Sequence, residues 1–339
     1  MRGIARQSTT VLLALAGALA IAAPAEAQLL AGEKEAKIAP IDGVVAADAQ
    51  WELAWAGLMT ADGIAGTDDG GLLFAQEQSN SIRKLGADGK EYVYQSDLAG
   101  PGAVSIDAQG RLFTVERTCT DPGLHMPSCA ELTRVVQLAP EHRIVANAFA
   151  DGRSLGRLND VMADGRGGAW FTVGGIYHAN ADGRVDVLAE GSDIFTNGLV
   201  LSPDGRTLYV TNRDKIMAFD IHKDGSAANR RIFATLSGEG KGFGGDGLAV
   251  DADGRLYVTG DAGIYVFDRS GKELGIMPVP RRAISAAFSG PGKQTLYVAT
   301  MGAVGPDGKA WTTPEGVRNV AMTIYRVKML APGFKGRPK

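Results

Sequence analysis

Cysteine, long apolar runs and an excess of one charge are all scarce in this chain of 339 residues. Two cysteines alone make a poor metal site, so no metal chemistry is assigned to them. The formal net charge is −3 and no basic block occurs, which argues against a nucleic-acid partner. Beyond the N-terminus, no apolar stretch is long enough to cross a bilayer.

Residues 1–27 have the three parts of a secretory signal. Arg2 and Arg6 precede an apolar, Leu/Ala-rich run from Thr10 to Ala23, and Ala25 to Ala27 fits the small-x-small cleavage pattern. We therefore expect a periplasmic or secreted protein that leaves the membrane after cleavage. An uncleaved N-terminal anchor is the alternative. In an oxidising compartment, Cys119 and Cys129 would form one local disulfide, with two free thiols as the alternative.

Glycine is abundant, with 46 residues, and this favours short strands and tight turns over long helices. One phrase, TNGLVLSPDGRTLYVT (196–211), contains two apolar strands joined by a Pro-Asp-Gly turn. Similar phrases begin at residues 62, 102, 159, 197, 246 and 285, at spacings of 40, 57, 38, 49 and 39. Turns of this type between alternating apolar runs are a strong hairpin signal.

Third strands usually follow these phrases, and fourth strands are visible in several of them. Four strands per repeat at this period predict an all-β, six-bladed β-propeller over residues 51–330. The strand near Trp51 would complete the last blade and close the ring. Residues 28–50 are expected to form a tether and residues 331–339 a flexible tail. Two long loops are expected at Cys119–Leu132 and Gly302–Val320; loops of this length are typically lids, but the sequence does not assign their role.

The first residue of each phrase lies where the chain enters the innermost strand of a blade, at one mouth of the central channel. The six residues at this position are Asp62, Gly102, Asn159, Asn197, Asp246 and Ser285. Because equivalent positions of the blades surround one axis, these side chains are expected to converge. Four of them offer strong oxygen ligands, which suit Ca²⁺, with Mg²⁺, Mn²⁺ or Zn²⁺ as alternatives. Asp and Asn also favour turns before strands, and that is the competing explanation.

Two sequence patterns are rejected because their structural context is wrong. Residues 152–156 match G-x-S-x-G, but a propeller strand follows where a helix is required. Residues 240–245 match G-x-G-x-x-G without a βαβ unit, so a dinucleotide site is not predicted.

Three stretches resemble one known family: RLNDV, TNGLVLSPDGRTLYVT and GGDGLAVDADGRLYVTGDAGIYVFDRSGKELGIMPVP. They are similar to the gluconolactonase / senescence marker protein (regucalcin-like) family, with good resemblance from about Asp62 to Lys328. The resemblance implies a six-bladed propeller with one divalent cation at the channel mouth. It also implies hydrolysis of sugar-type lactones, and of organophosphates or other esters in some relatives.

The same resemblance assigns roles to individual residues. It makes Asp62, Asn159, Asn197 and Asp246 the metal ligands, with Asp246 also the catalytic proton donor or acceptor. It makes Arg157, in the Arg-x-Asn phrase, a contact for the substrate, as Asn159 is also expected to be. The chain departs from the family where Asp62 replaces the usual, longer Glu, which leaves direct ligation by Asp62 open.

Other departures concern the second and sixth blades. Ser285 stands where several relatives have Asn, and the insertion of residues 119–132 is not general, so the substrate can differ from gluconolactone. Glu116, near that insertion, and His178 are further candidates for substrate contact. A solvated charge for Glu116, a structural role for His178 and an exposed ion pair for Arg157 are the alternatives.

The sequence thus predicts an exported hydrolase that opens a lactone or related cyclic ester with the help of a cation. Asp246 would activate water, and water activated by the cation itself is an equal alternative. A phosphotriesterase or arylesterase on the same scaffold is one rival. A non-catalytic, ligand-binding propeller with a structural ion is the other. We expect a small-molecule lactone or ester as partner and a monomer or weak dimer.

Overall fold

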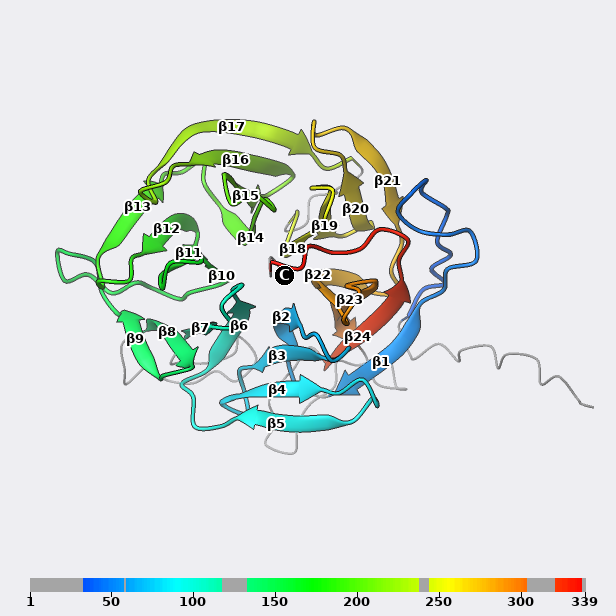
Figure 1. Ribbon diagram of the computed structural model, residues 1–339, viewed down its shortest axis with the longest axis horizontal. Helices are drawn as coiled ribbons and strands as arrows, with labels where there is room; N and C mark the ends of the chain where they lie inside the picture. The colour runs from blue at the N-terminus through cyan, green and yellow to red at the C-terminus, as the bar shows by residue number, and fades with distance from the viewer. Residues whose placement is uncertain (1–32, 58, 118–132, 238–243, 304–320, 337–339) are drawn as a thin grey trace, which may run out of the picture.

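The computed structural model describes residues 33–57, 59–117, 133–237, 244–303 and 321–336. Within these ranges the chain forms six four-stranded sheets around a central axis and no helix (Figure 1). The six-bladed β-propeller predicted from the repeats is therefore confirmed. The described ranges accordingly contain no helix that could span a membrane. The signal segment at residues 1–27 and both cysteines lie outside the described residues.

Successive strands of each blade step outward from the axis and pair in antiparallel fashion. The first blade consists of β2 (Asp62–Gly66), β3 (Leu72–Gln76), β4 (Ser81–Leu85) and β5 (Glu91–Gln95). The second consists of β6 (Pro101–Ile106), β7 (Leu112–Glu116), β8 (Arg134–Ala139) and β9 (Arg143–Ala146). The third consists of β10 (Val161–Ala163), β11 (Ala169–Val173), β12 (Gly175–Ala179) and β13 (Val185–Ala189). The fourth blade consists of β14 (Thr196–Leu201), β15 (Thr207–Asn212), β16 (Lys215–Ile221) and β17 (Ala227–Thr235). The fifth consists of β18 (Leu248–Val250), β19 (Leu256–Gly260), β20 (Gly263–Phe267) and β21 (Glu273–Met277). The sixth consists of β22 (Arg282–Ser289), β23 (Thr295–Ala303), β24 (Ala321–Lys328) and β1 (Glu52–Gly57).

The ring is closed by β1, which pairs with β24 as the outer strand of the sixth blade. Glu52 lies opposite Arg326 in this pairing, and the two side chains form a salt bridge of 2.9 Å. The indole of Trp51 also donates a hydrogen bond of 2.7 Å to the carbonyl of Pro278 in the fifth blade. The strand near Trp51 thus completes the last blade as the sequence predicts.

Aspartates fix the hairpin turns that end the innermost strands. Asp107 Oδ1 accepts hydrogen bonds from the backbone N–H groups two and four residues later, both at 2.9 Å. Asp251 makes the same pair of bonds in the fifth blade, also at 2.9 Å. A carboxylate that satisfies two turn amides explains why an Asp begins so many of these hairpins.

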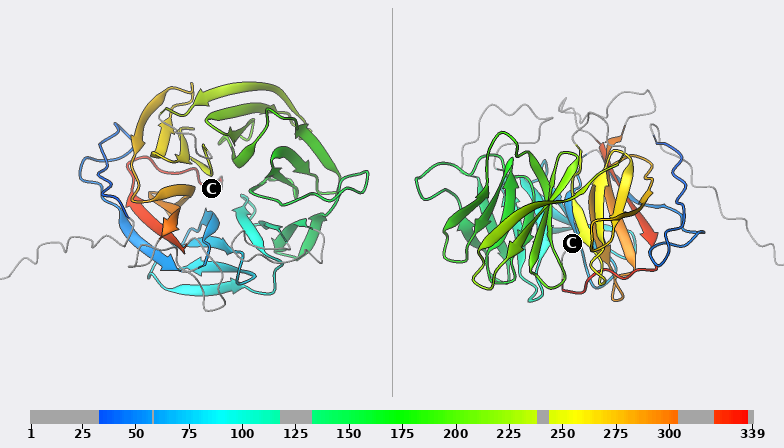
Figure 2. Two further views of the ribbon diagram at one scale, coloured as in Figure 1. Left: turned by 180° about the vertical axis from the view of Figure 1, so that it is seen from behind. Right: turned by 90° about the horizontal axis from the view of Figure 1, so that it is seen from above.

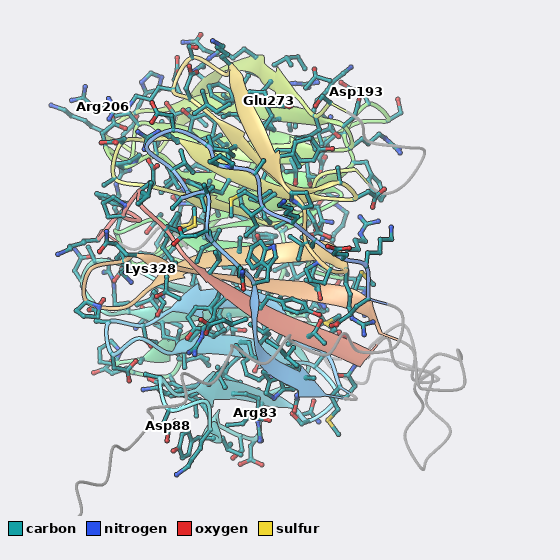
Figure 3. All side chains as sticks on the ribbon, turned by 90° about the vertical axis from the view of Figure 1, so that its right-hand side faces the viewer. Arg83, Asp88, Asp193, Arg206, Glu273 and Lys328 are labelled. Atoms are coloured by element: carbon teal, nitrogen blue, oxygen red, sulfur yellow. The ribbon has the colours of Figure 1, made fainter. Side chains whose placement is uncertain are left out.

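The core lies between neighbouring blades. Tyr257 of β19 and Phe288 of β22 meet edge to face, with ring centroids 4.9 Å apart, and so join the fifth and sixth blades. Exposed charged residues such as Asp88, Asp193 and Lys328 project from the outside of the ring (Figure 3). Apolar side chains on facing sheets therefore hold the blades together, while polar side chains cover the periphery.

The innermost strands β2, β6, β10, β14, β18 and β22 all begin at the same end of the channel, here called the mouth. Their hairpin turns lie at the other end, here called the far end. The side view in Figure 2 shows the blades standing between these two faces. Because β10 and β18 are only three residues long, the residues just before them form part of the mouth.

Residues 33–50, predicted as a tether, pack along the outside of the fifth and sixth blades. Val44 and Val45 are buried there, in a cluster that includes Met277 and Tyr325. The backbone N–H of Leu330 donates a 2.9 Å hydrogen bond to the carbonyl of Val44, which joins the two ends of the chain.

The C-terminal segment is not a free tail up to Gly336, contrary to the sequence-based expectation. Residues 331–336 cross the far end of the channel, where the C label lies in Figure 1. The N–H of Gly333 donates to the carbonyl of Lys293 at 2.7 Å, and the N–H of Ala252 donates to that of Pro332 at 2.9 Å. Phe334 packs against the core cluster of the fourth and fifth blades. These non-local bonds outweigh the Pro- and Gly-rich composition on which the expectation rested.

We therefore expect Phe334→Ala to lower the free energy of unfolding by roughly 1–3 kcal/mol, below the usual cost for a fully buried Phe because Phe334 is only partly buried. Leu330→Ala is the matched control, since Leu330 is 53% exposed and its loss should change stability by at most about 0.5 kcal/mol. Urea unfolding of both variants measures the difference. Equal stability of the two variants would show that the segment does not hold the far end together.

Candidate active site at the channel mouth

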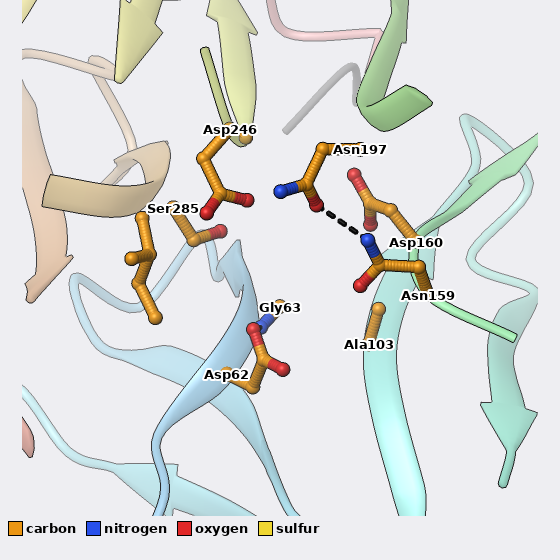
Figure 4. A pocket seen from close by; sticks show the side chains of 10 residues that line it. Asp62, Gly63, Ala103, Asn159, Asp160, Asn197, Asp246 and Ser285 are labelled. Atoms are coloured by element: carbon orange, nitrogen blue, oxygen red, sulfur yellow. Dashed lines mark hydrogen bonds between the residues drawn. The ribbon is translucent and has the colours of Figure 1, made fainter. Parts of the chain in front are cut away.

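Four residues from four blades line one small cavity at the mouth. Asp62, Asn159, Asn197 and Asp246 surround it, together with the hydroxyl of Ser285 (Figure 4). The cavity volume is about 10 Å³, which is room for a single water or ion. Residues up to 184 positions apart in the sequence thus meet because each begins, or just precedes, an innermost strand.

Buried threonines of the second strands hold the backbone at the mouth. Thr172 Oγ1 donates to the carbonyl of Asn197 at 2.5 Å, and Thr211 Oγ1 donates to that of Asp246 at 3.0 Å. Each bond runs from one blade to the next, so the position of each residue depends on its neighbour. Sequence reasoning missed these threonines, although a Thr recurs near the end of the second strand in most of the repeats.

Gly198 allows the fourth and fifth blades to approach at this point. A Cβ atom at Gly198 would lie 2.4 Å from the carbonyl oxygen of Asp246, which no real side chain tolerates. The Asn-Gly pair therefore combines a polar side chain directed to the channel with a close contact between backbones.

The amides of Asn159 and Asn197 are bonded to each other. Asn159 Nδ2 donates to Asn197 Oδ1 at 2.5 Å, as the dashed line in Figure 4 shows. In this arrangement the nitrogen of Asn197 points toward Asp246. Rotation of the Asn197 amide by half a turn would direct its oxygen into the cavity instead.

Asp160 is a third carboxylate at the cavity, and sequence reasoning missed it. Its Oδ1 accepts the N–H of Val161 at 2.8 Å and its Oδ2 accepts the N–H of Leu199 at 3.2 Å. The buried carboxylate thus ties the third blade to the fourth and adds negative charge beside Asn159 and Asn197. It follows Asn159 directly in the sequence, but no repeat equivalence marked it.

Asp246 lies in the most negative part of the mouth. Burial raises its pKa well above the usual value for an aspartate, and the nearby charges of Asp62 and Asp160 raise it further. The positive charge of Arg282 lowers the pKa of Asp246 and so opposes these effects. The pKa of Asp246 therefore depends on charges that other blades contribute.

Arg117 and Glu77 are two further charged residues that the sequence did not reveal. Arg117 Nη1 lies 3.0 Å from Asp62 Oδ2 and 3.0 Å from Glu77 Oε2. Burial raises the pKa of Glu77, and the two arginines Arg117 and Arg157 oppose that rise. Burial alone would lower the pKa of Arg117, but the carboxylates of Asp62 and Glu77 raise it above its usual value. Neither residue occupies the repeat position that identified the other candidates.

Arg157 lies beside this cluster, with a side chain that is 43% exposed. Its Nη2 is 3.3 Å from Glu77 Oε1 and from Oε2. Arg157 does not line the small cavity itself. It is placed so that a molecule entering the mouth can reach it.

Glu116 does not have the position expected of a substrate contact or of a solvated charge. Its side chain is buried, with Oε1 accepting the N–H of Ala99 at 3.2 Å and Oε2 paired with Arg134. Both oxygens are therefore used to hold the end of β7 to its surroundings.

His178 lies at the far end of its blade, away from the mouth. Strand β12 begins near the mouth, where Gly174 bridges to Thr196, and His178 is near its other end. Its ring stacks on Trp170 with centroids 3.9 Å apart, and Nε2 lies 2.9 Å from Asp164 Oδ2 in the hairpin turn. The expected substrate contact does not fit this position, because the strand direction carries residue 178 away from the ligands.

The donor set at the cavity fits a cation that prefers oxygen. Besides the carboxylate of Asp160, two carboxylates, two carboxamides and a hydroxyl converge from five blades. This chemistry suits Ca²⁺ better than ions that prefer sulfur or imidazole. Within the described ranges, no three His, Cys, Asp or Glu side chains are arranged to hold a metal. A cation here would therefore depend on the two asparagines as well as on the acids.

Comparison with known proteins establishes the family. The family model described as SMP-30/gluconolactonase/LRE-like region matches residues 87–302, which is more than half of the chain. The chain belongs to this family. The resemblance noted in the sequence is thus confirmed.

Named relatives of this family member include two lactonases. It is 24% identical to a gluconolactonase of Zymomonas mobilis over 301 residues, covering 77% of this chain and 78% of the relative. It is 30% identical to a pentonolactonase of Haloferax volcanii over 189 residues, covering 52% of this chain and 64% of the relative.

Solved structures show the same fold. A gluconolactonase from Xanthomonas campestris aligns with a TM-score of 0.61 at 22% identity, over 83% of this chain and 90% of that one. A calcium-binding regucalcin from Agrobacterium tumefaciens aligns with a TM-score of 0.55 at 19% identity, over 83% and 95%.

The position of His178 leads to a prediction that separates structure from chemistry. His178→Phe would keep an aromatic ring against Trp170 but leave the buried Asp164 without this partner. We expect the free energy of unfolding to fall by roughly 1–3 kcal/mol, with no change in the affinity for Ca²⁺. Urea unfolding and calorimetric titration with Ca²⁺ measure the two quantities. A large loss of affinity for Ca²⁺ with an unchanged free energy of unfolding would show that His178 contributes to the site at the mouth.

Proposed function

We propose that this protein is an exported, divalent-cation-dependent hydrolase that opens lactones. The observation that carries the proposal is the convergence of Asp62, Asn159, Asn197 and Asp246 on one ion-sized cavity. The relatives named gluconolactonase and pentonolactonase support a lactone as the substrate. The signal-like residues 1–27 support export to the periplasm or outside the cell.

Asn159, Asn197 and Asp246 would hold the cation, with Asp62 as the fourth candidate. Both oxygens of Asp62 already accept one hydrogen bond, Oδ1 from Gly63 N–H at 2.9 Å and Oδ2 from Arg117. Each carboxylate oxygen can accept more than one partner, so these bonds leave acceptor capacity. Ca²⁺ is the proposed ion, with Mg²⁺, Mn²⁺ or Zn²⁺ as alternatives, because all the donors are oxygens.

A cation held by these residues would supply polarisation of the lactone carbonyl. Asp246, whose carboxylate lies at the cavity, would take a proton from the attacking water. The water oxygen bonds to the carbonyl carbon and the bond from that carbon to the ring oxygen breaks. The proton on Asp246 then passes to the ring oxygen, so the product is a hydroxy acid.

Arg157 would orient the substrate. Its guanidinium is exposed at the mouth and is anchored on one side by Glu77. The remaining N–H groups of a guanidinium can bind the hydroxyl or carbonyl oxygens of a sugar-type lactone. An arginine in this role would affect KM more than the chemical step.

The test of this function is lactone hydrolysis in a pH-stat, with and without a chelator. We expect chelation to abolish turnover, added Ca²⁺ to restore it, and Asp246→Asn to lower kcat at least about 100-fold, the usual contribution of a positioned acid or base. Asp253→Asn is the matched control, because Asp253 is an exposed acid in the far-end turn of the same blade.

Three results would contradict the proposal in different ways. Turnover that resists chelation would remove the cation from the mechanism. Turnover confined to aryl or phosphate esters would change the substrate class. The absence of turnover of any ester by folded, cation-loaded protein would leave a binding function.

A further inference from the structure

The second blade contributes no side chain of its own at the ring position that defines the mouth. The residue there is Gly102, whereas five of the six blades place an Asp, Asn or Ser at this position. The space above Gly102 is filled by the guanidinium of Arg117, which follows the next strand of the same blade. A Cβ atom at Gly102 would lie 2.2 Å from Arg117 Nε and 2.5 Å from Cζ. Glycine is therefore required here so that the guanidinium can reach the channel.

The guanidinium of Arg117 uses all three nitrogens to join three blades. Nε donates to the carbonyl of Leu158 at 2.8 Å. Nη1 donates to Asp62 Oδ2 and to Glu77 Oε2, both at 3.0 Å. Nη2 donates to the backbone oxygen of Asn159 at 3.1 Å and to its Oδ1 at 3.2 Å. A guanidinium has five N–H groups, and five acceptors lie within hydrogen-bond distance of it.

Three of these acceptors belong to the candidate cation ligands: one to Asp62 and two to Asn159. The bonds to Asn159 fix both its backbone and its side chain, and the amide of Asn159 in turn holds Asn197. The orientation of three candidate ligands from three blades therefore depends on one guanidinium. A lysine has no planar fork and cannot reproduce this set of directions.

We propose that Arg117, admitted by Gly102, is a positioning residue that sets the affinity of the mouth for a divalent cation. The proposal rests on the proposed function only in requiring that the mouth binds a cation. Arg117 acts through Asp62 and Asn159 and contacts neither cation nor substrate. Partners that orient the ligands of a metal commonly change its affinity 10–100-fold when they are removed.

Gly102→Ala tests the proposal without changing Arg117 itself. The three heavy atoms nearest to the added Cβ all belong to the Arg117 guanidinium, so the methyl group would displace it while its charge remains. We expect the affinity for Ca²⁺, measured by calorimetric titration, to fall about 10–100-fold. Gly292→Ala is the matched control, since a Cβ there has no contact closer than 3.5 Å, and its affinity should equal that of the unchanged protein.

Arg117→Lys and the double variant Arg117→Met/Glu77→Gln separate positioning from charge. The double variant removes Arg117 and its buried partner together, so that no carboxylate of Glu77 is left unpaired. If Arg117 positions ligands, both variants bind Ca²⁺ about 10-fold or more weakly. If Arg117 acts only through its positive charge, Arg117→Lys binds normally, and the double variant, which removes one positive and one negative charge together, also binds about normally, which overturns the proposal. Circular dichroism and the unfolding midpoint establish that each variant is folded.

The outcomes distinguish this proposal from the proposed function. Unchanged affinity in folded Gly102→Ala and Arg117→Lys overturns the role of Arg117 and leaves the lactonase proposal intact. Weakened affinity in these variants supports the role of Arg117 even if no lactone is hydrolysed. Failure of the unchanged protein to bind any divalent cation contradicts both proposals.

Discussion

The antiparallel pairing of β1 with β24 closes the ring of blades, and the geometry of the mouth depends on it. The first blade supplies Asp62 and the sixth supplies Ser285, which are neighbours only in a closed ring. The first and sixth blades are in direct contact there, since the hydroxyl of Ser285 accepts the N–H of Ile64 at 3.2 Å. A chain that failed to pair its first strand with its last would leave two sheet edges exposed and the cavity open on one side.

Within the closed ring, the mouth concentrates acids that repel each other and so require compensation. Asp62, Asp160 and Asp246 lie around one cavity of about 10 Å³, and Glu77 is buried nearby. Arg117 offsets part of this charge through its bonds to Asp62 and Glu77. Burial and the remaining negative charge raise the pKa of Asp246, and this negative charge would favour a divalent cation at this point.

The sequence predicted the fold well because the signals are local and repeated. The hairpin turns follow from bonds within five residues, as at Asp107, and the six-fold repetition set the number of blades. Equivalence between repeats also brought Asp62, Asn159, Asn197 and Asp246 to one ring position. Residues outside the repeat pattern were not predictable in this way. Arg117 reaches the mouth across Gly102, and its partners are 40 to 55 positions away in the sequence.

Two of the expectations that the structure overturns failed for related reasons. His178 is a candidate for substrate contact in the sequence, but the direction of β12 carries it to the hairpin turn with Asp164. The C-terminal segment was expected to be free because of its composition, yet Gly333 and Phe334 bond and pack against the far end of the channel. Both depend on non-local contacts, which neither the turn chemistry nor the hydrophobic period of a strand reveals.

The measurement that tests this account most directly is a crystal structure of the protein soaked with Mn²⁺, with anomalous scattering used to locate the ion. The account predicts one strong peak in the cavity between Asn159, Asn197 and Asp246, with oxygen atoms of these residues as ligands. A clear peak elsewhere on the protein, with none at the mouth under saturating Mn²⁺, would contradict it.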